Sequence, residues 1–73
     1  MTNQEFKDCR IGLGVSQTGM AQLMGCLQSQ VSALETGRGG RKPTHIHAAF
    51  CAALELIHDQ GLLPELIARG GEK

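Results

Sequence analysis

The chain has 73 residues, of which 41% are hydrophobic and 3% aromatic, and its formal net charge is zero. This length predicts one domain, near the size at which a single core only just suffices. A neutral chain is not expected to grip nucleic acid by bulk electrostatics. No apolar run reaches the roughly 18 residues of a membrane span, and the N-terminus lacks a signal-peptide pattern. We therefore expect a cytoplasmic protein without a membrane contact.

Apolar spacing and capping residues predict five short helices and no strand. Their ranges are about 3–11, 17–24, 28–35, 45–59 and 64–69. The expected N-caps are Thr2 or Asn3, Ser16 and Thr44. The expected stops are the glycines at 12 and 14, 25, 37 and 61, and the tail 70–73 is expected to fray. These elements predict a compact all-α five-helix bundle.

The three cysteines, Cys9, Cys26 and Cys51, are odd in number, and each lies among apolar residues. We expect them to be reduced and to pack as small hydrophobic side chains. A domain of this size then needs another source of stability, and oligomerisation is the expected one.

A link of only three residues, 25–27, joins the second and third helices. Such a short link makes two helices cross steeply, as in a helix-turn-helix. Ala21 must then be small where the helices approach, Gly25 must turn with positive φ, and Val31 must enter the core. The sequence has a suitable residue at each position.

The stretch FKDCRIGLGVSQTGMAQLMGCLQSQVSALETGRGGRKP, residues 6–43, resembles the Cro/cI-type (XRE-like) helix-turn-helix regulators. These are regulators of phages and bacteria, and they include autorepressors found beside anti-CRISPR genes. The resemblance implies a single lambda-repressor-like DNA-binding domain over 1–73, with its helix-turn-helix at about 17–35. Residues 44–73 fit the family only loosely.

In this family the third helix lies in the major groove. The resemblance implies base contacts from Gln28, Ser29, Ser32 and Ala33, and their spacing places them on one outward strip. Glutamine can pair bidentately with adenine, and serine can bond to most bases. The competing interpretation is the ordinary polar surface of a small bundle.

The resemblance also implies which residues hold the DNA backbone. Phosphate contacts are expected from Gln17, which also braces Gln28, and from Arg38, Arg41 and Lys42. Without the resemblance, the segment 38–42 is equally well a solvated loop. Arg10 and Glu35 match a structural pair that bridges the first helix to the end of the third.

Leu27 departs from the family pattern, which has a capping Ser or Thr in its place. Losing that cap costs about 1 kcal/mol. The leucine either touches a thymine methyl or packs against the second helix, and packing is favoured. Gly19, in the middle of the second helix, weakens that helix by about 1 kcal/mol.

The fourth helix is apolar on most of its circumference. Its expected core face is Ile46, Ala49, Phe50, Ala53, Leu54 and Ile57, and a second apolar side is Ala48, Cys51, Ala52 and Leu56. We expect a homodimer built from the C-terminal helices, about 45–69, with Cys51, Leu56, Leu62, Leu63, Leu66 and Ile67 at its interface. Such a dimer would bind an inverted-repeat operator.

A metal site is the rival interpretation of the fourth helix, because His47, Cys51, Glu55 and His58 share one side of it. One helix cannot surround a metal, and the chain has no closed ligand set. We expect no metal, no cofactor, no small-molecule ligand and no enzymatic activity, since catalytic motifs are absent from the sequence.

The expected function is therefore sequence-specific binding to double-stranded DNA by a transcriptional regulator, most simply a repressor that occupies a promoter and can autoregulate its operon. The alternative is an antitoxin-like or protein-interaction subunit that uses the surface of the fourth and fifth helices.

Overall fold

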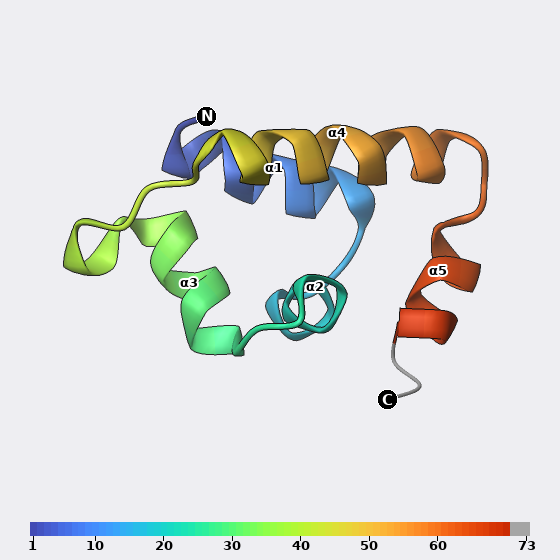
Figure 1. Ribbon diagram of the computed structural model, residues 1–73, viewed down its shortest axis with the longest axis horizontal. Coiled ribbons are helices and arrows are strands. Elements are labelled where there is room, and N and C mark those ends of the chain that lie inside the picture. Colours follow the sequence, from blue (N-terminus) through green and yellow to red (C-terminus); the bar gives the residue numbers. More distant parts are fainter. Residues whose placement is uncertain (71–73) are drawn as a thin grey trace.

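The computed structural model describes residues 1–70, which form five α-helices and one short 3₁₀ turn and contain no strand. The helices are α1 (Asn3–Leu13), α2 (Gln17–Met24), α3 (Gln28–Thr36), α4 (His45–Asp59) and α5 (Leu63–Gly70), with the 3₁₀ turn η1 at Arg38–Gly40. Figure 1 shows α1 and α4 running alongside each other, with α2 and α3 below them and α5 at the far end of α4. None of these helices is long and apolar enough to cross a membrane. Most of the tail predicted to fray, residues 71–73, lies outside the described residues.

The predicted capping residues begin and end most of the helices. Thr2 begins α1 with a reciprocal capping box, in which Thr2 Oγ1 accepts from Glu5 N at 3.1 Å and Glu5 Oε1 accepts from Thr2 N at 2.7 Å. The helix continues beyond the predicted Ile11, through Gly12 to Leu13, and ends at Gly14, one of the two predicted stops. One internal glycine costs only about 1 kcal/mol, whereas the Leu13 side chain becomes buried.

The turn between α2 and α3 has the features that its sequence predicts. Ser16 Oγ accepts from Gly19 N at 3.0 Å and begins α2. Gly25 ends that helix with φ of 72°, a left-handed conformation that favours glycine. Ala21, at 3% exposure, and the fully buried Val31 lie inside this pair of helices.

The core gathers side chains from all five helices. Its largest fully buried members are Phe6, Met20, Val31, Cys51 and Leu54. The three cysteines are free; Cys9 and Cys51 are buried and Cys26 is half-buried. Burial raises the pKa of all three thiols above its ordinary value of 9.0, so they stay protonated at neutral pH.

The face of α4 that enters the core matches the predicted one only in part, since Leu54 is buried and Phe50 and Ile57 pack against the core. Ile46 is 78% exposed, and Ala49 and Ala53 are also exposed, so their assignment to the core is wrong. Cys51, which was predicted for the second apolar side, is buried beside Leu54. His47 helps to fix this orientation of the helix, since its Nδ1 accepts from Thr44 N at 2.8 Å and its ring meets Phe6 edge-on. Periodicity alone could not find the inner side of a helix that is apolar nearly all round.

Burial also corrects the predicted dimer interface. Cys51 is 1% exposed and Leu63 is 4% exposed, so both belong to the core of one chain and cannot meet a partner. Leu66 and Ile67 are half-buried and pack against that core. Of the six predicted interface residues, only Leu56 and Leu62 are exposed, at 63% and 51%.

Candidate nucleic-acid interface

Four side chains from three helices form one continuous chain of hydrogen bonds where α1, α2 and α3 meet. Arg10 Nε and Nη2 donate to the two carboxylate oxygens of Glu35 at 2.5 and 3.1 Å. Gln17 Nε2 donates to the same carboxylate at 3.1 Å. Gln28 Nε2 then donates to Gln17 Oε1 at 2.5 Å. These hydrogen bonds link a buried ion pair to an exposed side chain at the start of α3.

The buried end of this chain is fully hydrogen-bonded. The Glu35 side chain is 1% exposed and accepts three donated bonds, two from Arg10 and one from Gln17. Arg10 Nη1 also donates to Val15 O at 3.0 Å, in the loop before α2. A buried charge pair needs such additional bonds to offset its desolvation. The pair therefore fixes α1, α3 and the start of α2 relative to one another.

The chain of hydrogen bonds also determines which way each glutamine amide points. An ionised carboxylate only accepts, so Gln17 must turn its NH₂ group towards Glu35 and its oxygen towards Gln28. Gln28 must in turn donate through Nε2, which leaves its Oε1 and one N–H unused. An exposed amide is thus held with one acceptor and one donor available for a ligand.

The residues expected to contact bases do not all face outward. Gln28 and Ser29 are exposed and Ser32 is half-buried. Ala33 is only 5% exposed, so its predicted place on the outward strip is wrong. The turn η1 folds back along this side of α3, and Arg38 Nη2 donates to Ser29 O at 3.3 Å. Ala33 therefore lies at the bottom of a groove between α3 and η1.

Arg38, Arg41 and Lys42 are all exposed beside that groove. The backbone that carries them is tied to α1 by Asn3, whose Nδ2 donates to Leu34 O at 2.6 Å and to Arg41 O at 2.9 Å. Sequence reasoning considered Asn3 only as a helix cap and missed this role. No sequence pattern links residues this far apart, so the anchor could be found only in the fold.

Leu27 is the N-cap residue of α3, with φ of −83° and ψ of 149°. Its side chain offers no acceptor, and only the return half of a capping box forms, with Gln30 Oε1 accepting from Leu27 N at 3.0 Å. The side chain is 69% exposed, so the prediction that it packs against α2 is wrong. An apolar tip therefore stands next to Gln28.

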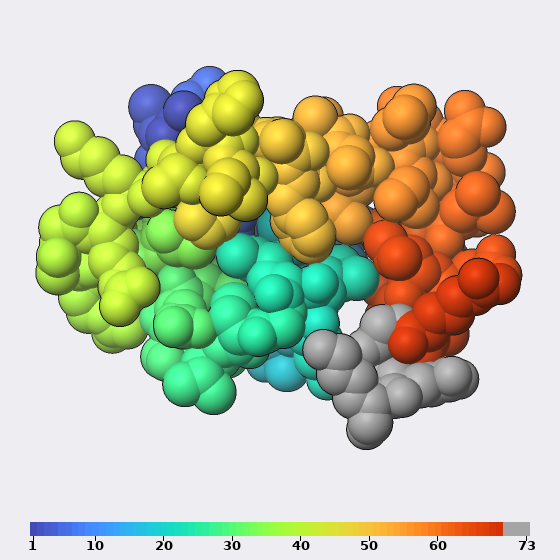
Figure 2. Space-filling view, in the orientation of Figure 1, coloured from blue at the N-terminus to red at the C-terminus, as the bar shows by residue number. Residues whose placement is uncertain are grey.

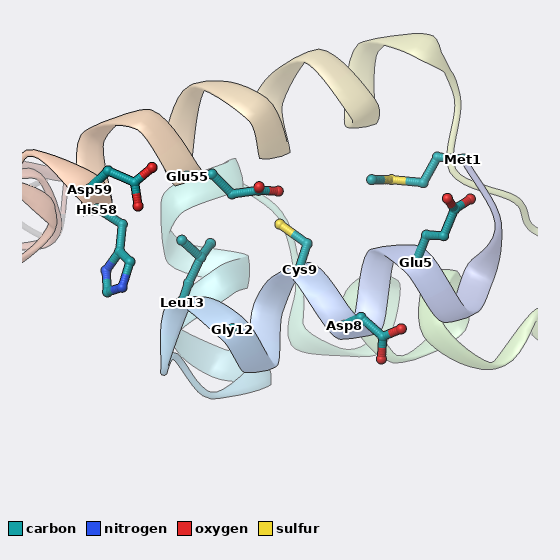
Figure 3. Close-up of a pocket in the computed structure, with 9 residues that line it drawn as sticks. All are labelled: Met1, Glu5, Asp8, Cys9, Gly12, Leu13, Glu55, His58 and Asp59. Carbon is teal, nitrogen blue, oxygen red and sulfur yellow. The ribbon is translucent and has the colours of Figure 1, made fainter.

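A hollow between α1 and α4 has the opposite electrostatic character. Figure 3 shows the side chains that line it, among them the carboxylates of Glu5, Asp8, Glu55 and Asp59. Four acids on one surface repel a phosphate backbone. His58 and Met1 also line this hollow, whereas none of Arg38, Arg41 and Lys42 does.

The four side chains of the rival metal site do not converge. Cys51 lies in the core and His47 caps its own helix, whereas Glu55 and His58 are exposed. Across residues 1–70, no group of three or more His, Cys, Asp or Glu side chains is placed to hold a metal ion.

No protein-family model, no curated protein and no solved structure matches the chain. The candidate interface therefore stands on its own geometry: a fixed amide, hydroxyl groups and an apolar tip at the start of α3, with three cations beside them.

Proposed function

We propose that the chain is a sequence-specific DNA-binding transcriptional regulator, in which α2 and α3 act as a Cro/cI-type helix-turn-helix within a lambda-repressor-like domain. The observation that carries this proposal is the hydrogen-bond chain that holds the exposed Gln28 amide at the start of α3. A fixed amide at the N-terminal end of a helix suits the reading of base edges in the major groove.

Gln28 is the proposed reader of adenine. Bidentate pairing with adenine needs one acceptor for the N6 amino group and one donor for N7. Those are the two groups that Gln28 keeps free while it bonds to Gln17. Because the amide cannot turn over without losing that bond, other base edges, with a different order of donors and acceptors, fit it less well.

The neighbours of Gln28 extend the proposed contact. Ser29 is exposed and Ser32 half-exposed on α3, where their hydroxyls can donate to or accept from bases. The exposure of Leu27 favours the thymine-methyl interpretation over packing against α2. An adenine beside a thymine is therefore the base step that this surface fits.

The phosphate contacts are proposed for the basic segment and for the start of α2. Arg38, Arg41 and Lys42 are exposed on a backbone that Asn3 holds against α1. The N-terminal backbone N–H groups of α2 at Gln17 can also donate to a phosphate. With about three cationic contacts per chain and about six per dimer, affinity should fall steeply with salt.

Repression is the simplest consequence of such binding. A homodimer on an inverted-repeat operator would exclude polymerase from a promoter, and the chain's own promoter is the first candidate. The alternative, an antitoxin-like or protein-interaction subunit, draws support from the exposed Leu56 and Leu62 near the end of α4. It predicts a complex with a different protein that forms without DNA.

The proposal is tested by measuring affinity for the DNA upstream of the chain's own gene by fluorescence anisotropy. Gln28→Ala should weaken binding by roughly 1–3 kcal/mol, or roughly 5- to 150-fold, and relax the preference at one base pair. Gln60→Ala, which removes another exposed glutamine at the end of α4, should bind like the wild type. Equal binding by the wild type and Gln28→Ala would falsify the reading role of α3.

A further inference from the structure

The outer side of α4 carries an apolar stripe that no part of residues 1–70 covers. Ile46 and Leu56 are 78% and 63% exposed at its two ends, and Ala49 and Ala53 are exposed between them. Their spacing of three and four residues places all four on one side of the helix. In Figure 2 α4 spans the upper part of the surface. Single exposed hydrophobic residues are common, but an aligned row of this kind marks an interaction site.

We infer that this stripe pairs with the same stripe of a second copy of the chain, with the two α4 helices antiparallel. This inference rests on the proposed function in supposing a homodimer, and it names the surface that makes one. A two-fold interface must be self-complementary, because every contact between two residues occurs twice, once on each side of the axis. Reversing one stripe brings Ile46 opposite Leu56 of the partner and Ala49 opposite Ala53 of the partner.

The stripe has the shape that such a pairing requires. The two alanines at its centre allow the helix backbones to approach closely. Beside its C-terminal end, Ile57, Leu62 and Leu66 line a shallow, mainly apolar groove that the Glu65–Arg69 ion pair also borders. Ile46, at the other end, is the most exposed large hydrophobic side chain among the described residues. A two-fold axis would therefore place the projecting Ile46 of each chain beside the apolar groove of the other.

The charges at the ends of α4 favour an antiparallel pair over a parallel one. Arg41 and Lys42 precede the helix, and Asp59 is its last residue. These charges oppose the dipole of their own helix, which is positive at the N-terminus. In an antiparallel pair the acidic end of one helix lies near the basic and dipole-positive end of the other. A parallel pair would place like charges together.

The size of the surface predicts a weak dimer. A helix of 15 residues is about 22 Å long, and one of its faces covers less than the roughly 800 Å² per partner of a standard interface. We therefore expect exchange between monomer and dimer at micromolar concentrations, with binding of two half-sites adding to the stability of the pair on DNA.

Sedimentation equilibrium of the DNA-free chain tests the inference. Ile46→Glu should raise the dimer dissociation constant at least tenfold, and Leu56→Glu should do the same, which covers the event that one variant fails to fold. Ile11→Glu is the matched control, because Ile11 is 56% exposed on α1, away from the stripe. Circular dichroism checks that each variant keeps its helices.

A chain that stays monomeric at about 1 mM, or one that associates with another protein instead of itself, would overturn the inference. So would a dimer that Ile46→Glu and Leu56→Glu leave intact, or that Ile11→Glu weakens equally. If the chain forms the dimer but does not bind DNA, only the proposed function is contradicted. If the chain binds DNA as a strict monomer, only this inference is contradicted.

Cysteine cross-linking tests the antiparallel register separately. Oxidation with a mild diamide reagent should cross-link a mixture of Ala49→Cys and Ala53→Cys chains, with one 49–53 disulfide joining the two. Each variant alone should cross-link poorly. Efficient 49–49 or 53–53 disulfides would show a parallel pair and overturn the antiparallel arrangement.

Discussion

The α2–α3 region and the α4–α5 region expose different kinds of side chain and fix them in different ways. At the start of α3 the exposed Gln28 amide, next to the apolar Leu27, is held by hydrogen bonds that run back to a buried ion pair. Along α4 and the turn that follows it, three large apolar side chains, Ile46, Leu56 and Leu62, are exposed. A polar side chain that recognises a base must be oriented before the DNA binds. The apolar side chains of α4, by contrast, become ordered only when another surface packs against them. The following predictions separate these two modes.

The largest expected effect comes from breaking the ion pair behind Gln28. Glu35→Ala should lower the free energy of unfolding by roughly 3 kcal/mol or more, because it leaves the Arg10 charge largely buried and unpaired. Urea denaturation measures the change. The apolar double variant Arg10→Met/Glu35→Leu should recover much of the stability, since it removes both charges.

The exposed pair between Glu65 and Arg69 on α5 is the matched control. Arg69 Nη2 lies 2.6 Å from Glu65 Oε1, but the Glu65 and Arg69 side chains are 55% and 77% exposed. Glu65→Gln should therefore change stability by less than about 0.5 kcal/mol. A loss comparable to that of Glu35→Ala would mean that burial does not distinguish the two pairs.

The next effect concerns the cations beside the reader. Arg38→Ala/Arg41→Ala should weaken binding to all DNA sequences alike and reduce the slope of log affinity against log salt by about 2 per chain. Lys7→Ala removes an exposed cation on α1 and should leave the slope unchanged. Anisotropy titrations at several salt concentrations measure both. A loss of sequence preference in the arginine variant would assign it to base reading instead.

A smaller effect is expected at two glycines that sequence patterns treat alike. Gly37 ends α3 with φ of 77°, and a Cβ there would lie 3.3 Å from Asn3 Oδ1. Gly37→Ala should cost about 1 kcal/mol or more from backbone strain. Gly12 lies inside α1 with open space around it, so Gly12→Ala should stabilise the chain by about 0.5–1 kcal/mol. Thermal unfolding of both variants measures the two changes in stability. A change of the same sign in Gly37→Ala and Gly12→Ala would contradict the prediction.

The smallest effect is a pH dependence from the thiols between α1 and α4. Burial raises the pKa of Cys9 and of Cys51 above the ordinary 9.0. Both thiols are protonated below about pH 9 in the folded and in the unfolded chain. Their contribution to the free energy of unfolding is therefore fully present below that pH. Above that pH the unfolded thiols ionise first, and stability should fall as pH rises. Cys9→Ala/Cys51→Ala should remove most of this slope, and a slope that survives in the variant would assign it to other groups.

Sequence reasoning found the features that depend on neighbouring residues, and the family resemblance supplied the Arg10–Glu35 pair, but several features that depend on packing were missed. Capping by Ser16 and the glycine turn at Gly25 are local, so the bounds of α2 follow from the sequence. The inner side of α4 is not local, because apolar residues surround that helix and contact with α1 selects among them. Ile46 was therefore assigned to the core and proved exposed.

The candidate interface shows the same division. The positions of Gln17 and Gln28 at the starts of α2 and α3 follow from local sequence. The burial of Ala33 depends on how η1 folds back over α3, and the anchoring by Asn3 depends on a contact between distant segments. Leu27 was expected to pack against α2, but its place at the tip of the turn leaves it exposed.

The start of α3 is proposed to contact DNA, and the outer side of α4 is not. The most direct test is a two-dimensional ¹⁵N NMR titration of the labelled chain with duplex DNA from its own upstream region. Shifts should concentrate at residues 17, 27–32 and 38–42, and the Gln28 side-chain amide should shift among the most. Shifts confined to α4 and α5, or no shifts at saturating DNA and low salt, would contradict the account.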